Sequence, residues 1–246
     1  ITHFFNPPRY MRLVEFIVSD SNDATLIESM VSFFENVLGK GVVFSNDTPN
    51  FIANRIGIYG MMMAIDKTIK YNLSIDEVDM LTGTLIGRPK SATYRTADLA
   101  GIDVLSFVAS TALNKCTDDD EVDIYKTPEF INKLIERGSL GQKSGEGFYK
   151  KIDKGVIHSL DFDTLNYTSK AKRRFDSVKV AKEYINIPER IVSFMRHEDS
   201  AAKFIKELTL SVLSYSAKRV GDAANDIVAI DNAMKWGFGW TSGPFE

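Results

Sequence analysis

Two titratable side chains, His3 and Glu15, lie in short apolar runs near the start of the chain. The runs are HFF and LVEFIV, and a turn written NPPR separates them. Apolar runs of this length are typical of strands in a sheet that is covered on both faces. A buried carboxylate is costly unless it is paired, so His3 is the expected partner of Glu15 if the two strands are neighbours. A histidine held by a carboxylate at one ring nitrogen can accept a proton at the other, which is general base chemistry.

A purely structural pair is the alternative for these two residues, because perturbed titratable pairs also occur in protein cores.

For two other side chains a structural role must also be compared with a functional one. Asn54 is expected in the first turns of a helix that continues to about Tyr71, where a buried amide needs hydrogen-bond partners from either helix packing or a ligand. Lys143 lies in LGQKSGEGFYKK, a glycine-rich loop, and its chemistry alone predicts a solvated loop lysine.

The elements that would position these residues follow from periodicity. Apolar residues recur at helical spacing over 24–38, and a third short strand is expected over 40–45. Strand, helix and strand in this order are typical of the end of an open α/β sheet. Downstream, helices dominate, and Ser74 with Glu77 forms a capping box at the start of one of them.

Composition excludes several classes of function. The net charge of −3 gives no reason to expect nucleic acid or an anionic membrane as a partner. A basic cluster at Lys170, Lys172, Arg173 and Arg174 is expected on a solvated face, with a contact to phosphate or to another domain as the alternative. The single cysteine, Cys116, excludes an internal disulfide, and no Cys/His cluster has the spacing of a metal site. With no signal peptide and no long apolar run, a cytoplasmic protein is expected.

Four stretches of the chain resemble the 3-hydroxyacyl-CoA dehydrogenase family, in the order that the family has them. They are HFFNP with LVE, DTPNFIANR, GRPKSATYRTADLAGID and LGQKSGEGFYKK. The resemblance implies NAD as the cofactor and an acyl-CoA as the substrate, with His3 and Glu15 as the catalytic dyad. It also implies that Asn54 holds the substrate near the reacting carbon and that Lys143 contacts the cofactor.

The chain departs from the family pattern at two places. Asn50 replaces the usual glycine of the second stretch, which asparagine tolerates if the position needs a positive φ. In the third stretch Ser91-Ala92-Thr93 replaces Gly-Pro-Phe, which leaves the preferred acyl chain length open.

The second part of the chain repeats the first at an offset of 152 residues. Asp79 and Gly87 correspond to Asp231 and Gly239, while Lys206 stands where Asn54 would recur. We therefore expect a structural second repeat that pairs with the first within one chain, where single-copy relatives would pair across a homodimer. The arrangement resembles multifunctional β-oxidation proteins, in which an enoyl-CoA hydratase domain can share the polypeptide.

These observations predict a mainly α protein, with tandem helical dehydrogenase domains preceded by the last strands of a Rossmann-type domain. The expected ranges are 1–47 for the end of the NAD-binding domain, 48–151 for the first helical domain, 152–198 for an irregular linker and 199–246 for a truncated second repeat. No Gly-x-Gly-x-x-Gly follows any strand, so we expect a piece of a longer enzyme that binds NAD poorly by itself. The alternatives are a non-catalytic assembly module and a related dehydrogenase of free hydroxy acids.

Overall fold

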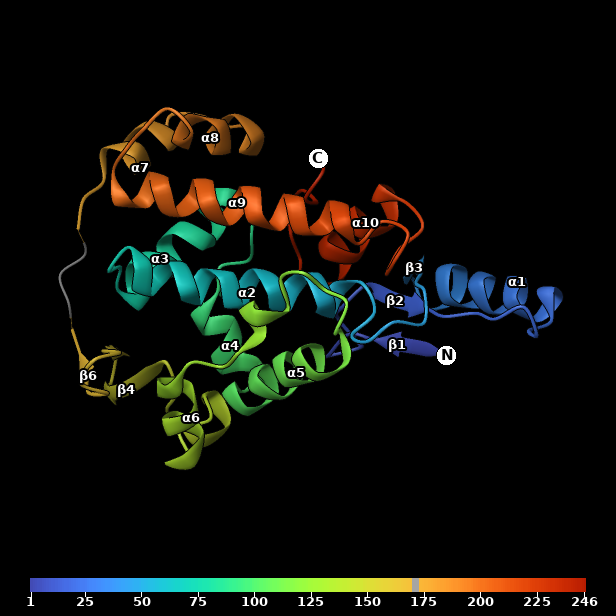
Figure 1. The fold of residues 1–246 in the computed structure, drawn as a ribbon, viewed down its shortest axis with the longest axis horizontal. Helices are drawn as coiled ribbons and strands as arrows, with labels where there is room; N and C mark the ends of the chain where they lie inside the picture. Colours follow the sequence, from blue (N-terminus) through green and yellow to red (C-terminus); the bar gives the residue numbers. More distant parts are fainter. Residues whose placement is uncertain (170–172) are drawn as a thin grey trace. The chain divides into compact units, whose positions relative to one another are not determined.

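The computed structural model describes residues 1–169 and 173–246. The chain divides into two compact units: Ile1–Gly57 together with Ser211–Glu246, and Ile58–Leu210. Helices dominate both, as expected, and two long ones, α2 (Ala53–Lys70) and α9 (Ser200–Lys218), contribute residues to each unit (Figure 1). Within the described residues no single helix is long and apolar enough to cross a membrane, although α4 (Tyr94–Ala100) and α5 (Ile102–Lys115) reach that length and hydropathy as a pair bent by 96°.

The first unit contains a three-stranded sheet with the order β1-β2-β3. Strands β1 (Thr2–Phe4) and β2 (Leu13–Phe16) are antiparallel, whereas β2 and β3 (Gly41–Phe44) are parallel. The parallel pair needs a crossover, which α1 (Ala24–Ser32) and a π-helical turn (Phe33–Val37) provide. This confirms the strand, helix and strand predicted from the apolar pattern.

Helix α10 (Ile227–Gly237) packs against β2 and β3 of this sheet. The contact is close, because a Cβ on Gly41 would collide with the ring of Trp236 and one on Gly237 would collide with Leu13. The residues of β2 are all buried, including Glu15. The start of the chain and its last helix therefore share one core.

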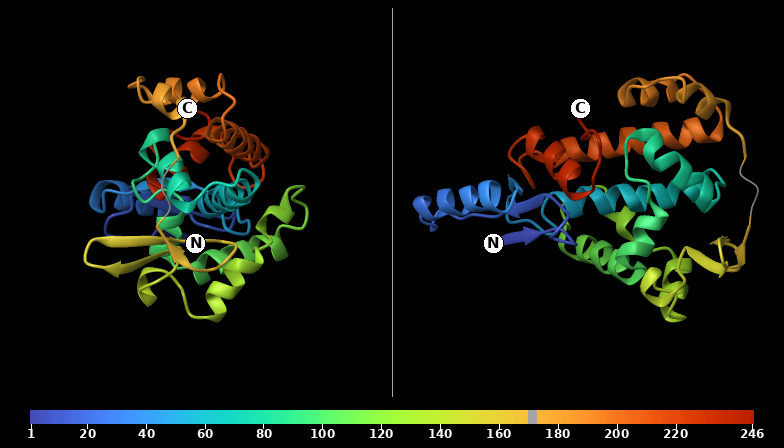
Figure 2. Two further views of the ribbon diagram at one scale, coloured as in Figure 1. Left: turned by 90° about the vertical axis from the view of Figure 1, so that its left-hand side faces the viewer. Right: turned by 180° about the vertical axis from the view of Figure 1, so that it is seen from behind.

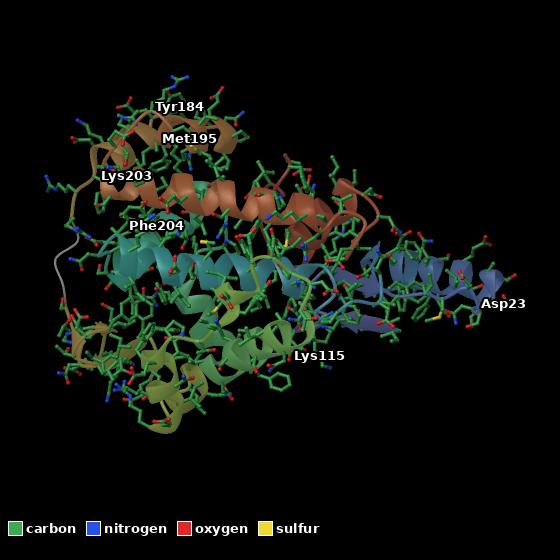
Figure 3. All side chains as sticks on the ribbon, viewed as in Figure 1. Asp23, Lys115, Tyr184, Met195, Lys203 and Phe204 are labelled. Atoms are coloured by element: carbon green, nitrogen blue, oxygen red, sulfur yellow. The ribbon has the colours of Figure 1, made fainter. Side chains whose placement is uncertain are left out.

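The second unit is built mainly from helices, and a small antiparallel sheet lies between its earlier and its later helices in the chain (Figure 2). The helices are α3 (Ile75–Thr82), α4 (Tyr94–Ala100), α5 (Ile102–Lys115), α6 (Glu129–Glu136), α7 (Asp176–Ala181) and α8 (Ile187–Phe194). The strands, in the order β4-β5-β6, are β4 (Tyr149–Asp153), β5 (Val156–Leu160) and β6 (Tyr167–Thr168). On α9 the aromatic ring of Phe204 is buried, whereas the neighbouring Lys203 is exposed (Figure 3).

The expectation of an irregular segment over 152–198 is wrong. Most of the sheet and both α7 and α8 lie there, because β-branched residues in 156–157 pair with β4 and Asn186 caps α8. Of the basic cluster, Lys170 and Lys172 lie outside the described residues. Arg173 is not simply solvated, because its guanidinium binds the buried carboxylate of Glu77 with two contacts of 2.8 Å.

The predicted capping box is confirmed at the start of α3. The Ser74 side chain accepts a hydrogen bond from the Glu77 N–H, and the Glu77 carboxylate accepts one from the Ser74 N–H. Burial acts to raise the pKa of Glu77, but hydrogen bonds from Arg173 and Ser74 outweigh it and lower the pKa from 4.5 to about 2. Glu77 therefore joins a helix start to Arg173, nearly a hundred residues further along the chain.

Replacing Glu77 by glutamine is expected to lower the free energy of unfolding at pH 7 by about 1–3 kcal/mol, the range for hydrogen bonds to charged groups. Because the folded-state pKa lies below the ordinary value, this contribution is complete above about pH 4.5 and is lost as the pH falls toward 2. Urea unfolding of both proteins at pH 7 and about pH 3 measures it. A stability difference that does not shrink at the lower pH would contradict this assignment.

Local geometry recurs at the offset of 152 residues. Ser74 and Asp226 are both N-caps, and each side chain accepts from the backbone N–H three residues on. Asp79 accepts from the N–H of Thr93, and Asp231 accepts from the N–H of Phe245. Gly87 and Gly239 have φ values of 73° and 67°. The repeated pattern of the sequence thus coincides with repeated backbone hydrogen bonding.

Candidate active site

The antiparallel register of β1 and β2 places His3 directly opposite Glu15. The His3 Nδ1 atom lies 2.6 Å from Glu15 Oε2, and the Glu15 side chain is fully buried while 30% of the His3 side chain is exposed. The second ring nitrogen, Nε2, makes no hydrogen bond to any residue in the described part of the chain. One nitrogen is therefore held and the other is free, as expected from the sequence.

Glu15 has a second role that the sequence did not predict. Its other oxygen, Oε1, accepts hydrogen bonds from the N–H groups of Ile52 and Ala53 at 3.0 and 2.8 Å. These groups belong to the start of α2, where N–H groups lack partners within the helix and the helix dipole favours a negative charge. The carboxylate is thus oriented by a helix terminus on one side and by His3 on the other.

Aromatic rings fix the position of the imidazole. The ring centroids of Phe5 and Phe51 lie 5.3 and 5.4 Å from that of His3. Asn50 has a φ of 66°, which confirms the expected tolerance of asparagine at the family's glycine position. Phe51 also has a positive φ, 51°, which is unusual for a bulky residue and indicates a strained turn that brings its ring to the histidine.

Asn54 lies in the first turn of α2, one residue after the Ala53 N–H that binds Glu15. It is half-buried, and within the described ranges its side chain makes no hydrogen bond or ion pair. The helix-packing hydrogen bond considered as an alternative is therefore not observed. The role of Asn54 as a substrate ligand stays a prediction.

Lys143 lies in the second compact unit, in a short 3₁₀ helix (Gln142–Ser144). Its Nζ binds both carboxylate oxygens of Asp103 at 2.6 and 2.7 Å, and these hydrogen bonds lower the pKa of Asp103. The structure thus gives the amino group a structural partner, and the expected cofactor contact of Lys143 stays a prediction.

The glycine-rich stretch that contains Lys143 is a loop, as predicted. The Asp98 carboxylate anchors this loop by accepting hydrogen bonds from the N–H groups of Phe148 and Tyr149, at 2.8 and 2.9 Å. A Cβ on Gly147 would lie 2.2 Å from the Asp98 carboxylate, so only glycine fits there. Burial raises the pKa of Asp98 to about 6, although its backbone hydrogen bonds act in the opposite direction.

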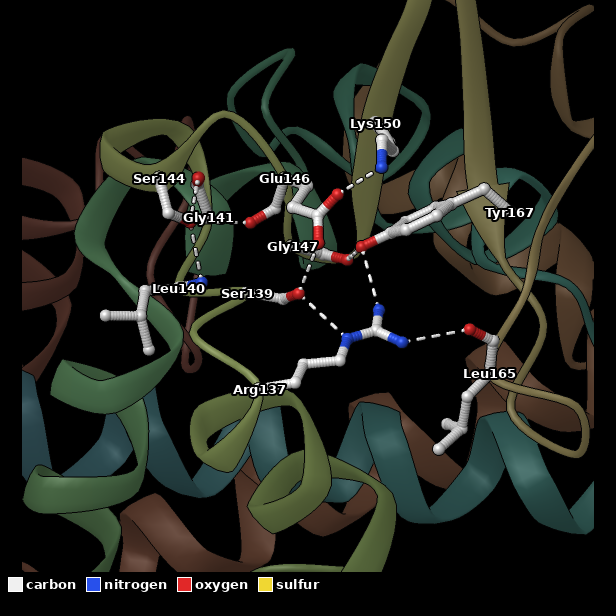
Figure 4. Close-up of polar contacts among 10 residues, drawn as sticks. All are labelled: Arg137, Ser139, Leu140, Gly141, Ser144, Glu146, Gly147, Lys150, Leu165 and Tyr167. Atoms are coloured by element: carbon white, nitrogen blue, oxygen red, sulfur yellow. Dashed lines mark hydrogen bonds and ion pairs between the residues drawn. The ribbon is translucent and has the colours of Figure 1, made fainter.

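Arg137 ties the other side of this loop to β6. It donates to Ser139 at 2.8 Å and to the Tyr167 hydroxyl and the Leu165 carbonyl at 3.0 Å each, and Ser139 in turn donates to Glu146 (Figure 4). The loop is therefore braced by side chains from both flanking segments.

Comparison with known proteins identifies the protein family to which the chain belongs. Residues 1–48 match the model for the NAD binding domain of 3-hydroxyacyl-CoA dehydrogenase, and residues 51–151 match the model for the C-terminal domain of the same family. The chain therefore belongs to the 3-hydroxyacyl-CoA dehydrogenase family.

One relative, named "Probable 3-hydroxyacyl-CoA dehydrogenase" in Bacillus subtilis, is 45% identical over 245 residues, which cover 100% of this chain and 31% of the relative. The chain thus spans about a third of that protein. The fold also matches 3-hydroxybutyryl-CoA dehydrogenase of Escherichia coli, with a TM-score of 0.67 and 18% identity over 99% of this chain and 61% of that one. The dehydrogenase part of multifunctional enzyme 1 of C. elegans matches with a TM-score of 0.52 and 17% identity, over 97% of this chain and 48% of that one.

Proposed function

We propose that the protein carrying this chain is an NAD-dependent dehydrogenase that oxidises the 3-hydroxyl group of an acyl-CoA. The observation that carries the proposal is the contact of 2.6 Å between His3 Nδ1 and the buried Glu15 carboxylate, in a chain of this family. General base chemistry at a carbon-borne hydroxyl needs an imidazole with one nitrogen oriented and the other free, which this pair provides.

Neutral His3 accepts the proton of the 3-hydroxyl group at Nε2. Ionised Glu15 holds Nδ1 as the protonated nitrogen and stabilises the imidazolium that forms, as carboxylates do for catalytic histidines elsewhere. The two backbone N–H groups at the start of α2 hold the Glu15 carboxylate in this orientation. In the reverse direction the imidazolium of His3 is the acid.

NAD would accept the hydride from the substrate carbon. The strands β1 to β3 fit the end of an NAD-binding domain, in agreement with the match over residues 1–48. The sequence contains no glycine-rich strand-turn-helix, so the phosphate-binding part of such a site is not among these residues. We therefore expect this chain alone to bind NAD weakly, which isothermal titration calorimetry measures.

Asn54 supports the proposed site from the helix side. Its amide has no partner among the described residues, it is half-buried, and it belongs to the helix turn that Glu15 caps. An amide in this state can donate to a substrate oxygen and fix the reacting carbon near His3. The same capped turn would then position the substrate and the base together.

A substrate panel tests the proposed function directly. We expect the protein that carries this chain to reduce acetoacetyl-CoA with NADH and to act on free β-keto acids at a rate lower by at least about tenfold, because the CoA portion supplies binding energy away from the reacting carbon. Equal rates on the free acid would point to a hydroxy-acid dehydrogenase instead. No reaction with any of these substrates would favour an assembly role.

We also propose that the second repeat pairs with the first inside one chain and has no catalytic dyad of its own. Contacts in both compact units support the pairing, since Arg55 donates to Tyr215 in one and Lys70 binds Glu207 in the other. As the resemblance to multifunctional β-oxidation proteins implies, an enoyl-CoA hydratase domain would share the polypeptide; a relative named as a putative fatty acid oxidation complex trifunctional enzyme, 31% identical over all of this chain, supports a multifunctional parent.

A further inference from the structure

Two ion pairs join the segments of α2 and α9, one in each compact unit. In the first unit, Nη2 of Arg55 lies 3.8 Å from Oδ2 of Asp222, in the turn after α9. In the second unit, Nζ of Lys70 lies 2.7 Å from Oε1 of Glu207. In the first pair the base is early in α2, whereas in the second it is the last residue of α2.

The four residues are related by the same offset as the sequence repeat. Glu207 follows Arg55 by 152 positions, and Asp222 follows Lys70 by 152 positions. Each pair therefore joins the early position of one repeat to the late position of the other. The two repeats have opposite charges at these positions: the first repeat has bases at both, and the second repeat has acids at both.

Burial and further contacts around the two pairs determine which charges these positions can hold. Only 4% of the Arg55 side chain is exposed, and its Nε donates to the Tyr215 hydroxyl at 2.7 Å. Glu207 also accepts a hydrogen bond from the Tyr71 hydroxyl and lies 3.3 Å from Lys67. Burial acts to raise the pKa of Glu207, but hydrogen bonds from Lys70 and Tyr71 outweigh it and lower the pKa to about 2. A base in place of Glu207 would therefore face Lys70 and Lys67, which repel it. At the other pair Asp222 also binds Arg219 of its own repeat, at 2.9 Å.

We propose that these reversed charges select the pairing partner, so that the first repeat accepts the second repeat of its own chain and rejects a second copy of itself. If α2 met another α2 in the same geometry, Arg55 would face Lys70 and Lys67. If the second repeat met itself, Glu207 would face Asp222. Such like-charge contacts act against a wrong partner, while the two ion pairs favour the right one. The inference rests on the proposed pairing of the repeats, and stability and assembly test it independently of enzyme activity.

The first test replaces Glu207 by arginine in the full chain. The substitution gives both repeats a base at the early position and places it against Lys70 and Lys67. We expect the midpoint of thermal unfolding to fall by about 2–4 °C. The matched control is Lys133→Glu, which breaks an exposed pair with Glu129 and should shift the midpoint by less than about 1 °C. An unchanged midpoint in E207R would overturn the proposal.

The second test combines Glu207→Arg with Lys70→Glu. Both repeats then have a base at the early position and an acid at the late one, so each is complementary to the other and to itself. We expect the thermal midpoint to recover toward that of the unchanged chain. We also expect sedimentation to show a fraction of dimers, in which like repeats of two chains pair, that rises with concentration above that of the unchanged chain, because pairing of like repeats no longer meets repulsion.

The double variant keeps the proposal falsifiable even if E207R alone does not fold, since the proposal requires the double variant to fold. Failure of the thermal midpoint to recover would show that the two residues are not coupled, and would overturn it. Recovery without any increase in dimers would show that the charges stabilise the pairing but do not select the partner, and would equally overturn the proposal.

Discussion

Replacing His3 by glutamine is expected to lower kcat for oxidation of a 3-hydroxyacyl-CoA by about 10²- to 10⁴-fold, the usual contribution of a positioned general base. Glutamine can still donate a hydrogen bond to Glu15 but cannot accept a proton at neutral pH. The free energy of unfolding should change little, because 30% of the His3 side chain is exposed and the contact to Glu15 can be replaced. Steady-state kinetics and urea unfolding of the protein that carries this chain measure the two effects.

His158→Gln is the matched control, because His158 lies in β5 and has no acidic partner among the residues described. It should leave kcat unchanged. A His3→Gln variant with normal turnover would rule out His3 as the base and leave the His3–Glu15 pair as a purely structural contact.

Replacing Glu15 by alanine is expected to lower the free energy of unfolding by about 3–5 kcal/mol, the range for breaking a buried charged pair. The change leaves the N–H groups of Ile52 and Ala53 without an acceptor and opens a cavity in a strand that is fully buried. Loss of catalysis would follow, because His3 Nδ1 would lose the carboxylate that orients it and stabilises the imidazolium. Urea unfolding followed by circular dichroism measures the loss of stability.

Glu15→Gln separates the two roles of this side chain. The amide oxygen can still accept from the start of α2, so the loss of stability should be smaller than for alanine. Its NH₂ group would donate to His3 Nδ1 and force the proton onto Nε2, the nitrogen that must accept it. We therefore expect a folded protein with little activity. Equal stability of the alanine variant and the unchanged protein would show that the contact to α2 contributes nothing.

The sequence predicted the local features of the site well. Two apolar runs around a turn predicted two strands, with His3 as the partner of Glu15 if the strands are neighbours, and the antiparallel register of the structure places the two residues opposite each other. The capping box of Ser74 and Glu77 and the positive φ of Asn50 also followed from local chemistry. Each of these depends on residues that are near in sequence or on one backbone angle.

What the sequence did not predict depends on contacts between distant segments. The second partner of Glu15 is 37 residues away, and nothing in either segment alone indicates that the helix start meets this carboxylate. Pairing of Lys143 with Asp103 across 40 residues is of the same kind. The small sheet that includes β5 was missed because its strands are short and mostly exposed, so they lack the apolar pattern that marks a covered strand.

Glu15 binds the histidine with one oxygen and the start of α2 with the other, so its loss is expected to harm folding as well as the proposed chemistry. In the proposed mechanism His3, by contrast, contributes to chemistry alone. If a descendant of this protein lost its enzymatic task but kept its place in an assembly, the two positions should therefore diverge at different rates. Glu15 would be conserved under selection for a folded chain, whereas His3 would be replaced. A lineage that keeps Glu15 but not His3 would then be one in which the enzymatic activity has been lost.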